Sequence, residues 1–188
     1  MTSLHTKALA GLLQLLVAMA LMLFLPAWTF NYWQAWLFLA VFFTSTLAIT
    51  LYLMKNDPQL LERRVQAGPV SEKETNQKVI QSLASFAFVM VIAFPAVDFR
   101  LGWSFVPTGL VIAGDALVAL GLFAVFLVFK ENTFTSGTIE VASDQTVIST
   151  GPYAIVRHPM YSGAFVMLIG VPLALGSWWG LLTVVPMV

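Results

Sequence analysis

The residues best suited to chemistry gather at positions 151–163, where a polar loop meets a long uncharged run. Arg157 carries a permanent positive charge and a forked set of donors that suits a carboxylate or a phosphate. Pro159 fits the first turn of a helix, which places His158 near the N-cap. The unpaired N–H groups of that helix and its dipole then point back at the loop. The stretch therefore predicts a binding site for an electron-rich group.

Two tyrosines add aromatic surface to the same stretch. Tyr153 and Tyr161 can stack on a base or lie against a cation. Arg and His beside a helix in a membrane also serve as interfacial anchors, and Tyr is common at that depth. The local residues alone leave both interpretations open.

The composition is that of a membrane protein. Of 188 residues, 59% are hydrophobic and 10% are charged, and the mean hydropathy is +0.87. A soluble domain of this size could not cover so much apolar surface. The net charge of zero argues against a nucleic-acid partner. With no Cys and two His, we expect no disulfide, no thiol nucleophile and no metal centre.

The apolar runs predict an all-α, polytopic membrane protein of about five spanning helices in one domain, 1–188. We expect spans at 8–28, 36–54, 79–97, 105–129 and 160–175, the first being retained and not a signal peptide. A turn at 176–180 divides the last run, and only eight residues follow from Leu181. Because a crossing needs about 20 residues, this last run is predicted to be a broken or incomplete hairpin.

Two long polar loops join these spans. In 55–78 we expect a short helix over Gln59 to Val65 and a capping box at 71–74, and we favour a solvated loop on lipid headgroups over a substrate site. In 130–157 we expect turns and short extended pieces at 138–141 and 146–149.

Asp115 lies inside an apolar run and is a functional candidate. We favour the interpretation that its carboxyl group pairs with a Ser or Thr of a neighbouring helix, or that it is protonated.

The basic residues predict an orientation. Eight of the nine Lys and Arg lie in the amino-terminal tail and the two long loops, and Arg100 alone lies on the opposite side. The amino terminus and both loops should therefore be cytoplasmic.

The stretch Gly151-Pro152-Tyr153, followed by Arg157-His158-Pro159 and Tyr161, resembles the cofactor motif of the isoprenylcysteine carboxyl methyltransferase and phospholipid methyltransferase superfamily. These are integral membrane enzymes that use S-adenosylmethionine. The match covers about 133–179, and 130–188 carries the cofactor motif. The first two helices resemble bacterial members more loosely, which implies a bacterial inner membrane.

The resemblance implies a set of cofactor contacts and a role for one arginine. The implied cofactor-binding residues are Gln145, Thr146, Val147, Ile148, Tyr153, His158, Pro159, Met160 and Tyr161. Arg157 is the implied catalytic residue, which would hold an acidic substrate head or the carboxylate of the cofactor. In the family the pattern continues to a cytoplasmic segment with an Arg and a pair of Glu that close over the cofactor. The sequence as given ends before such a segment, which leaves its activity open.

The implied function is methyl transfer at the cytoplasmic face of the membrane to a lipidic or isoprenoid-like acceptor, with carboxyl O-methylation favoured. Phospholipid-type N-methylation is the alternative, and the sequence does not name the acceptor. A sterol-reductase-like oxidoreductase using a nicotinamide cofactor is a second enzyme class, which the short chain disfavours. A third interpretation is a non-catalytic family member that acts as a membrane scaffold.

Overall fold

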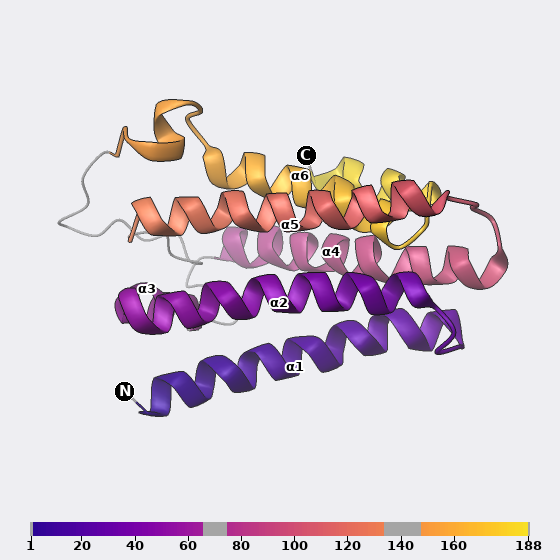
Figure 1. The fold of residues 1–188 in the computed structure, drawn as a ribbon, viewed down its shortest axis with the longest axis horizontal. Helices are drawn as coiled ribbons and strands as arrows, with labels where there is room; N and C mark the ends of the chain where they lie inside the picture. The colour runs from indigo at the N-terminus through magenta and orange to yellow at the C-terminus, as the bar shows by residue number, and fades with distance from the viewer. Residues whose placement is uncertain (1, 66–74, 134–147, 188) are drawn as a thin grey trace.

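The chain is a bundle of long helices (Figure 1). The computed structural model describes residues 2–65, 75–133 and 148–187, and no strand occurs within them. The helices are α1 (Thr2–Ala27), α2 (Trp33–Asn56), α3 (Pro58–Val65), α4 (Thr75–Leu101), α5 (Thr108–Glu131) and α6 (Pro159–Ala174), with the 3-10 helices η1 (Gly151–Ala154) and η2 (Trp179–Met187). The all-α prediction is confirmed.

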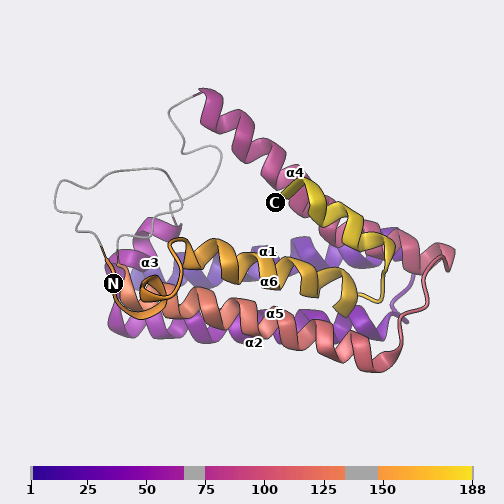
Figure 2. The same ribbon diagram turned by 90° about the horizontal axis from the view of Figure 1, so that it is seen from above.

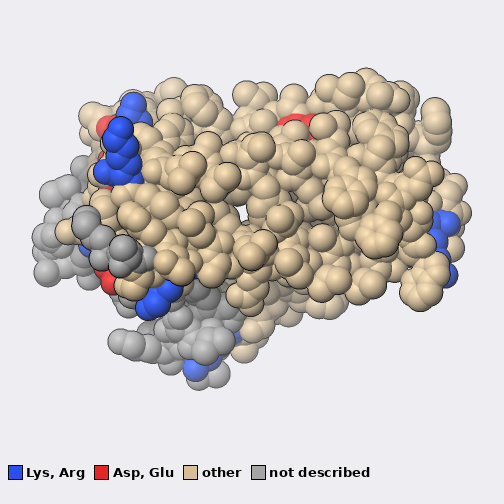
Figure 3. Space-filling view, turned by 60° about the horizontal axis from the view of Figure 1, so that its bottom comes forward, with Lys and Arg blue, Asp and Glu red and all other residues tan. Residues whose placement is uncertain are grey.

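Four helices, α1, α2, α4 and α5, are long and apolar enough to cross a membrane. Helix α6 is apolar and has 16 residues, about 24 Å at 1.5 Å per residue. Figure 3 shows Lys and Arg at the two ends of the molecule and a band almost free of charge between them. Length, composition and charge distribution together identify a multi-pass membrane protein.

The last apolar run is the broken hairpin predicted from the sequence. After α6 the chain turns at Gly176, whose φ of +74° lies in the left-handed region that favours glycine. It then returns as η2, which packs against α4. Figure 2 shows η2 lying along α4, whose amino-terminal half leaves the rest of the bundle.

One end of the bundle collects the segments of interest. The amino terminus, α3 and η1 lie together there, and the α1–α2, α4–α5 and α6–η2 connections lie at the other end (Figure 1). The extended piece predicted at 138–141 lies outside the described residues, as does most of that at 146–149; Ile148 and Ser149 are irregular. The predicted capping box at 71–74 also lies outside them.

Helix α3 forms where its sequence predicts. Pro58 occupies the first turn, and Asp57 Oδ1 accepts a hydrogen bond from the backbone N–H of Leu60 at 3.0 Å, the bond of an N-cap. Leu60 and Leu61 are buried against α1, α2 and α5. The helix is therefore folded back onto the bundle, so the loop is not wholly solvated as expected.

Helices α5 and α6 pack backbone to backbone along a seam of glycines. A Cβ on Gly121 would lie 2.6 Å from the carbonyl oxygen of Gly163, and one on Gly170 would lie 2.7 Å from that of Gly114. Each helix carries its two glycines seven residues apart, which places them on one face. This contact sets the first turn of α6 beside the carboxyl end of α5.

The opposite end is closed by buried hydrogen bonds. Asp98, the residue after the span expected at 79–97, lies in the last turn of α4 and is fully buried. Its Oδ2 accepts hydrogen bonds from Ser104 Oγ at 2.6 Å and from Ser177 Oγ. The hydroxyl of Tyr32 donates to the carbonyl oxygen of Leu175 at 2.6 Å. These bonds join the ends of α2, α4 and α6.

Asp115 is buried in α5 with 4% of its surface exposed. Neither carboxyl oxygen has a hydrogen-bond partner within the described part of the chain. Of the two expected states of Asp115, pairing with a Ser or Thr is not found within the described residues, and protonation stays a prediction.

Candidate functional site

The short helix η1 is tied to the carboxyl end of α5. Thr150 Oγ1 donates a hydrogen bond to Glu131 Oε1, and Asn132 Nδ2 donates to the Tyr153 hydroxyl at 2.9 Å. Gly151 has φ +56°, and a Cβ there would lie 3.0 Å from Glu131 Cδ. The backbone conformation thus favours glycine, and a Cβ there would press on the Glu131 side chain. Tyr153 is fixed in position by these contacts and is half-buried.

Helix α6 begins as the sequence predicts. His158 is the N-cap residue, with φ −129°, and Pro159 takes the first helical position. The backbone N–H of Ser162 bonds to the carbonyl oxygen of His158 at 3.2 Å. The His158 side chain makes no capping hydrogen bond. The imidazole and the first-turn N–H groups are therefore available to an acceptor from outside the helix.

An exposed surface of one cation and two rings lies at this helix start. The rings of His158 and Tyr161 have centroids 5.9 Å apart, at 57° to each other, and Tyr161 is 75% exposed. Arg157 is exposed and has neither a hydrogen bond nor an ion pair with any described residue. The three side chains can therefore contact a ligand without first breaking a hydrogen bond to a described residue.

The neighbouring predicted residues face the protein. Pro159 is buried, and Met160 is half-buried against a cluster that includes Phe129 of α5 and Leu61 of α3. Ile148 is half-buried at the start of the segment that leads to η1. Gln145, Thr146 and Val147 lie outside the described residues.

The sequence interpretation missed the residues that position this loop. Glu131 and Asn132 end α5 and hold Thr150 and Tyr153. Their position in the sequence could have indicated them, because Glu131 and Asn132 follow Lys130 directly after the long apolar run.

The sequence interpretation predicted helix α3 but did not place it beside the carboxyl end of α5. Arg63 Nη1 donates to the carbonyl oxygen of Thr133 at 3.0 Å. The Arg64 guanidinium carbon lies 4.5 Å from the centroid of the Phe129 ring, a cation–π contact. Both arginines thus bring α3 to the carboxyl end of α5.

Comparison with known proteins bears on the carboxy-terminal part of the chain. A model of the phospholipid methyltransferase family matches residues 110–188, which include α5, η1, α6 and η2. No curated protein and no solved structure matches the chain. The matched part contains all the residues predicted to bind the cofactor. The carboxy-terminal part of the chain, residues 110–188, is thus similar to the phospholipid methyltransferase family, which belongs to the isoprenylcysteine and phospholipid methyltransferase superfamily.

Proposed function

We propose that the chain is an S-adenosylmethionine-dependent methyltransferase. Its acceptor is a lipidic or isoprenoid-like molecule, reached at the cytoplasmic face of the membrane, in a bacterial inner membrane. The observation that carries the proposal is the exposed group of Arg157, His158 and Tyr161 at the start of α6, inside the part of the chain that matches a methyltransferase family.

The side chains at the start of α6 fit the chemistry of this cofactor. S-adenosylmethionine presents a carboxylate, an adenine ring and a sulfonium. The guanidinium of Arg157 and the N–H groups of α6 suit the carboxylate. The rings of Tyr153 and Tyr161 suit the adenine or the sulfonium.

When bound, S-adenosylmethionine supplies a methyl group on a sulfonium, which a carboxylate oxygen takes by in-line displacement to leave an ester and a neutral thioether. The carboxylate is already ionised, so the chain needs no general base. The work of the protein is to position the acceptor and to exclude water. Pro159 is buried and Met160 packs against the cluster that includes Phe129 and Leu61, so the protein beneath this region is apolar, which favours the exclusion of water.

Phospholipid-type N-methylation is the second candidate, because the matching family is named for phospholipids. An amine acceptor must arrive neutral, which would require a group that takes its proton. Assaying transfer of a labelled methyl group to carboxylate-bearing and to amine-bearing lipids separates the two reactions.

Calorimetric binding of S-adenosylmethionine and S-adenosylhomocysteine to the detergent-purified chain tests the cofactor. We expect saturable binding that weakens about tenfold or more in His158→Ala and in Tyr161→Ala, as expected for the loss of a stacked ring. His5→Ala removes the other histidine, in α1, and should leave binding unchanged. Absence of binding, or equal binding by all variants, would contradict the proposal and favour the non-catalytic interpretation.

A further inference from the structure

A groove of about 540 Å³ lies among α1, α2, α3 and α5, at the same end of the bundle as the candidate site. This volume is in the range of pockets that hold small-molecule ligands, about 300–1,000 Å³. Its walls are mainly apolar, with Leu12, Ile49 and Leu122 among them, and its charged lining residues within the described chain are Lys7 and Arg64.

The groove runs from the charged end of the bundle into the membrane-spanning part. Its lining extends from Lys7 to Leu15 on α1, from Leu53 back to Thr46 on α2, and from Phe129 back to Leu122 on α5. Each of these stretches is about two helical turns, or about 11 Å. The groove therefore covers about a third of a hydrocarbon core of about 30 Å.

Arg64 lines the groove at its charged end, and its donors have no partner among the described residues. Its guanidinium lies over the Phe129 ring and has neither a hydrogen bond nor an ion pair with a described residue. Desolvation lowers the pKa of this guanidinium, but an arginine remains protonated in a protein. A partly desolvated cation whose forked donors are unbonded within the described chain favours an anion that can accept two bonds.

Lys7 adds a second positive charge to the same lining, and it also has neither a hydrogen bond nor an ion pair with a described residue. The groove thus presents two cations at its outer end and apolar walls inward. This arrangement complements an amphiphile with an anionic head and an apolar chain.

The mouth of the groove adjoins the residues of the candidate site. Phe129 lines the groove and belongs to the same packed cluster as Leu61 and Met160. Two to three residues further along α5, Glu131 and Asn132 hold the η1 loop. A head group bound by Arg64 would therefore lie on the side of α5 where Met160 starts α6.

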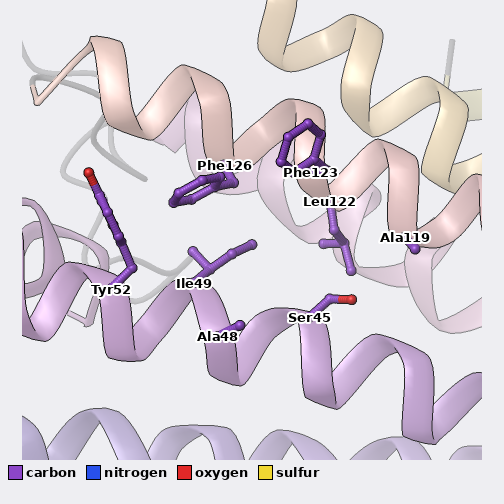
Figure 4. A pocket seen from close by; sticks show the side chains of 8 residues that line it. All are labelled: Ser45, Ala48, Ile49, Tyr52, Ala119, Leu122, Phe123 and Phe126. Carbon is purple, nitrogen blue, oxygen red and sulfur yellow. The ribbon is translucent and has the colours of Figure 1, made fainter.

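A cleft on the other side of Ile49 and Leu122 provides a contrast. It has a volume of about 400 Å³, lies between α2 and α5, and is lined by no charged residue of the described chain. Figure 4 shows its aromatic side chains, Tyr52, Phe123 and Phe126. Without a cation this cleft offers no charged partner to an anionic head group, although Ser45 and Tyr52 bring hydroxyls to its lining.

We propose that the groove bounded by α1, α2, α3 and α5 binds the methyl acceptor, a membrane amphiphile whose carboxylate is held by Arg64 and Lys7 and whose apolar chain lies between α1, α2 and α5. This assignment rests on the proposed methyltransferase function for the identity of the ligand as acceptor. It leaves Arg157 to the carboxylate of the cofactor.

The test is equilibrium binding of radiolabelled palmitate, hexadecanol and hexadecyl phosphate to the full chain in nanodiscs of zwitterionic lipid. Arg64→Gln with Lys7→Gln should weaken palmitate binding about tenfold or more, as expected for the loss of charge-assisted hydrogen bonds, and should leave hexadecanol binding unchanged. Arg64→Lys should restore part of the affinity. Lys55→Gln removes an exposed basic residue outside the groove and should change nothing.

A second variant, Gly11→Phe, tests the part of the groove that is proposed to hold the apolar chain of the amphiphile. Gly11 lines the groove, and nothing lies within 4 Å of a Cβ placed on it. Gly11→Phe should therefore fill the groove and weaken binding of palmitate and hexadecanol alike. Gly109, on α5, is equally open but lies outside the groove, so Gly109→Phe should leave both unchanged.

Each contrary outcome overturns a stated part of the proposal. Palmitate binding that survives both the charge variants and Gly11→Phe would exclude the groove as the site. Tighter binding of hexadecyl phosphate than of palmitate would exclude a carboxylate as the preferred head. S-adenosylmethionine binding, measured on the same samples, reports separately on the proposed function, because none of these variants touches Arg157, His158 or Tyr161.

Discussion

Tyr153 offers two groups to a ligand or to the fold, a hydroxyl and a ring, and substitution can separate them. The hydroxyl accepts a hydrogen bond from Asn132. We expect Tyr153→Phe to lower the free energy of unfolding by about 1 kcal/mol and to change the Kd of S-adenosylmethionine by less than about threefold, because the ring remains. Tyr153→Leu should weaken binding about tenfold. Equal weakening in both variants, by calorimetry, would assign the effect to the hydroxyl.

Asp57 determines where α3 begins. Its carboxylate caps the helix through the N–H of Leu60, and α3 carries both arginines that reach the end of α5. We expect Asp57→Ala to destabilise the helix by about 1 kcal/mol and to speed hydrogen exchange at positions 60–65. Asp57→Asn keeps an oxygen that can cap and should exchange like the wild type. Slow exchange in the alanine variant would mean that α3 is held by packing alone.

The α5–α6 seam determines where the first turn of α6 lies. Replacing a helical Gly by Ala gains about 1 kcal/mol from helix propensity, whereas overpacking costs about 1–3 kcal/mol. At Gly121 a Cβ would lie 2.6 Å from backbone atoms, which cannot move without shifting α6, so overpacking should win. We expect Gly121→Ala to lower the Tm and to weaken cofactor binding.

Gly109→Ala is the matched control for the seam, because Gly109 is on the same helix and has open space around it. There the helix propensity acts alone, so the Tm should stay equal or rise slightly. If Gly121→Ala behaved like Gly109→Ala in thermal unfolding, the close contact between the two helices would be disproved.

At the far end of the bundle, buried hydrogen bonds of Asp98 and Ser177 join α4, the α6–η2 connection and η2. Ser177 Oγ donates to Asp98 and accepts the N–H of Gly180 at 2.8 Å. Ser177→Ala leaves both partners short of a bond in a buried place, which should cost about 1–3 kcal/mol. Ser82→Ala removes an exposed hydroxyl whose bond within the described chain is to the carbonyl oxygen of Lys78 in the same helix, and it should have no measurable effect on thermal unfolding in detergent. A similar Tm for the two variants would contradict the structural role of the buried hydrogen bonds.

The sequence predicts the spanning elements well because a membrane crossing is a local property. An apolar run of sufficient length specifies α1, α2 and α5 without knowledge of their neighbours. The choice of which helices pack against each other is not a local property of the sequence. The glycines of α5 indicate close packing, but only the fold identifies Gly163 and Gly170 as the opposing residues.

In the candidate site, too, local features can be predicted from the sequence, whereas contacts between distant residues cannot. Pro159 and its neighbours predict the start of α6, which the structure confirms. Asn132 and Tyr153 are 21 residues apart, and no periodicity relates them. The charge of Asp98 ends the span expected at 79–97, whereas hydrogen bonds from Ser104 and Ser177 allow Asp98 to be buried within α4.

Across the whole molecule, the two ends differ in how their polar groups are used. At the far end, Asp98 and Ser177 are buried and bonded to each other. At the other end, Arg64 and Arg157 have neither a hydrogen bond nor an ion pair with described residues. Donors that have no partner among the described residues are open to a ligand, so this second end is the better candidate for binding. Its access to cytosolic molecules depends on the orientation of the chain in the membrane.

Orientation can be measured directly, because the chain contains no cysteine. Ile155 at the η1 end and Phe105 at the opposite end are 86% and 87% exposed. The distribution of Lys and Arg predicts that the η1 end is cytoplasmic. Phe105→Cys should therefore react with a membrane-impermeant maleimide in intact cells, and Ile155→Cys only after the cells are permeabilised. Val17→Cys, exposed on α1 near mid-membrane, should react in neither condition, because a thiol in hydrocarbon does not ionise. The reverse pattern would place the site outside the cytoplasm and separate it from the cytosolic cofactor pool.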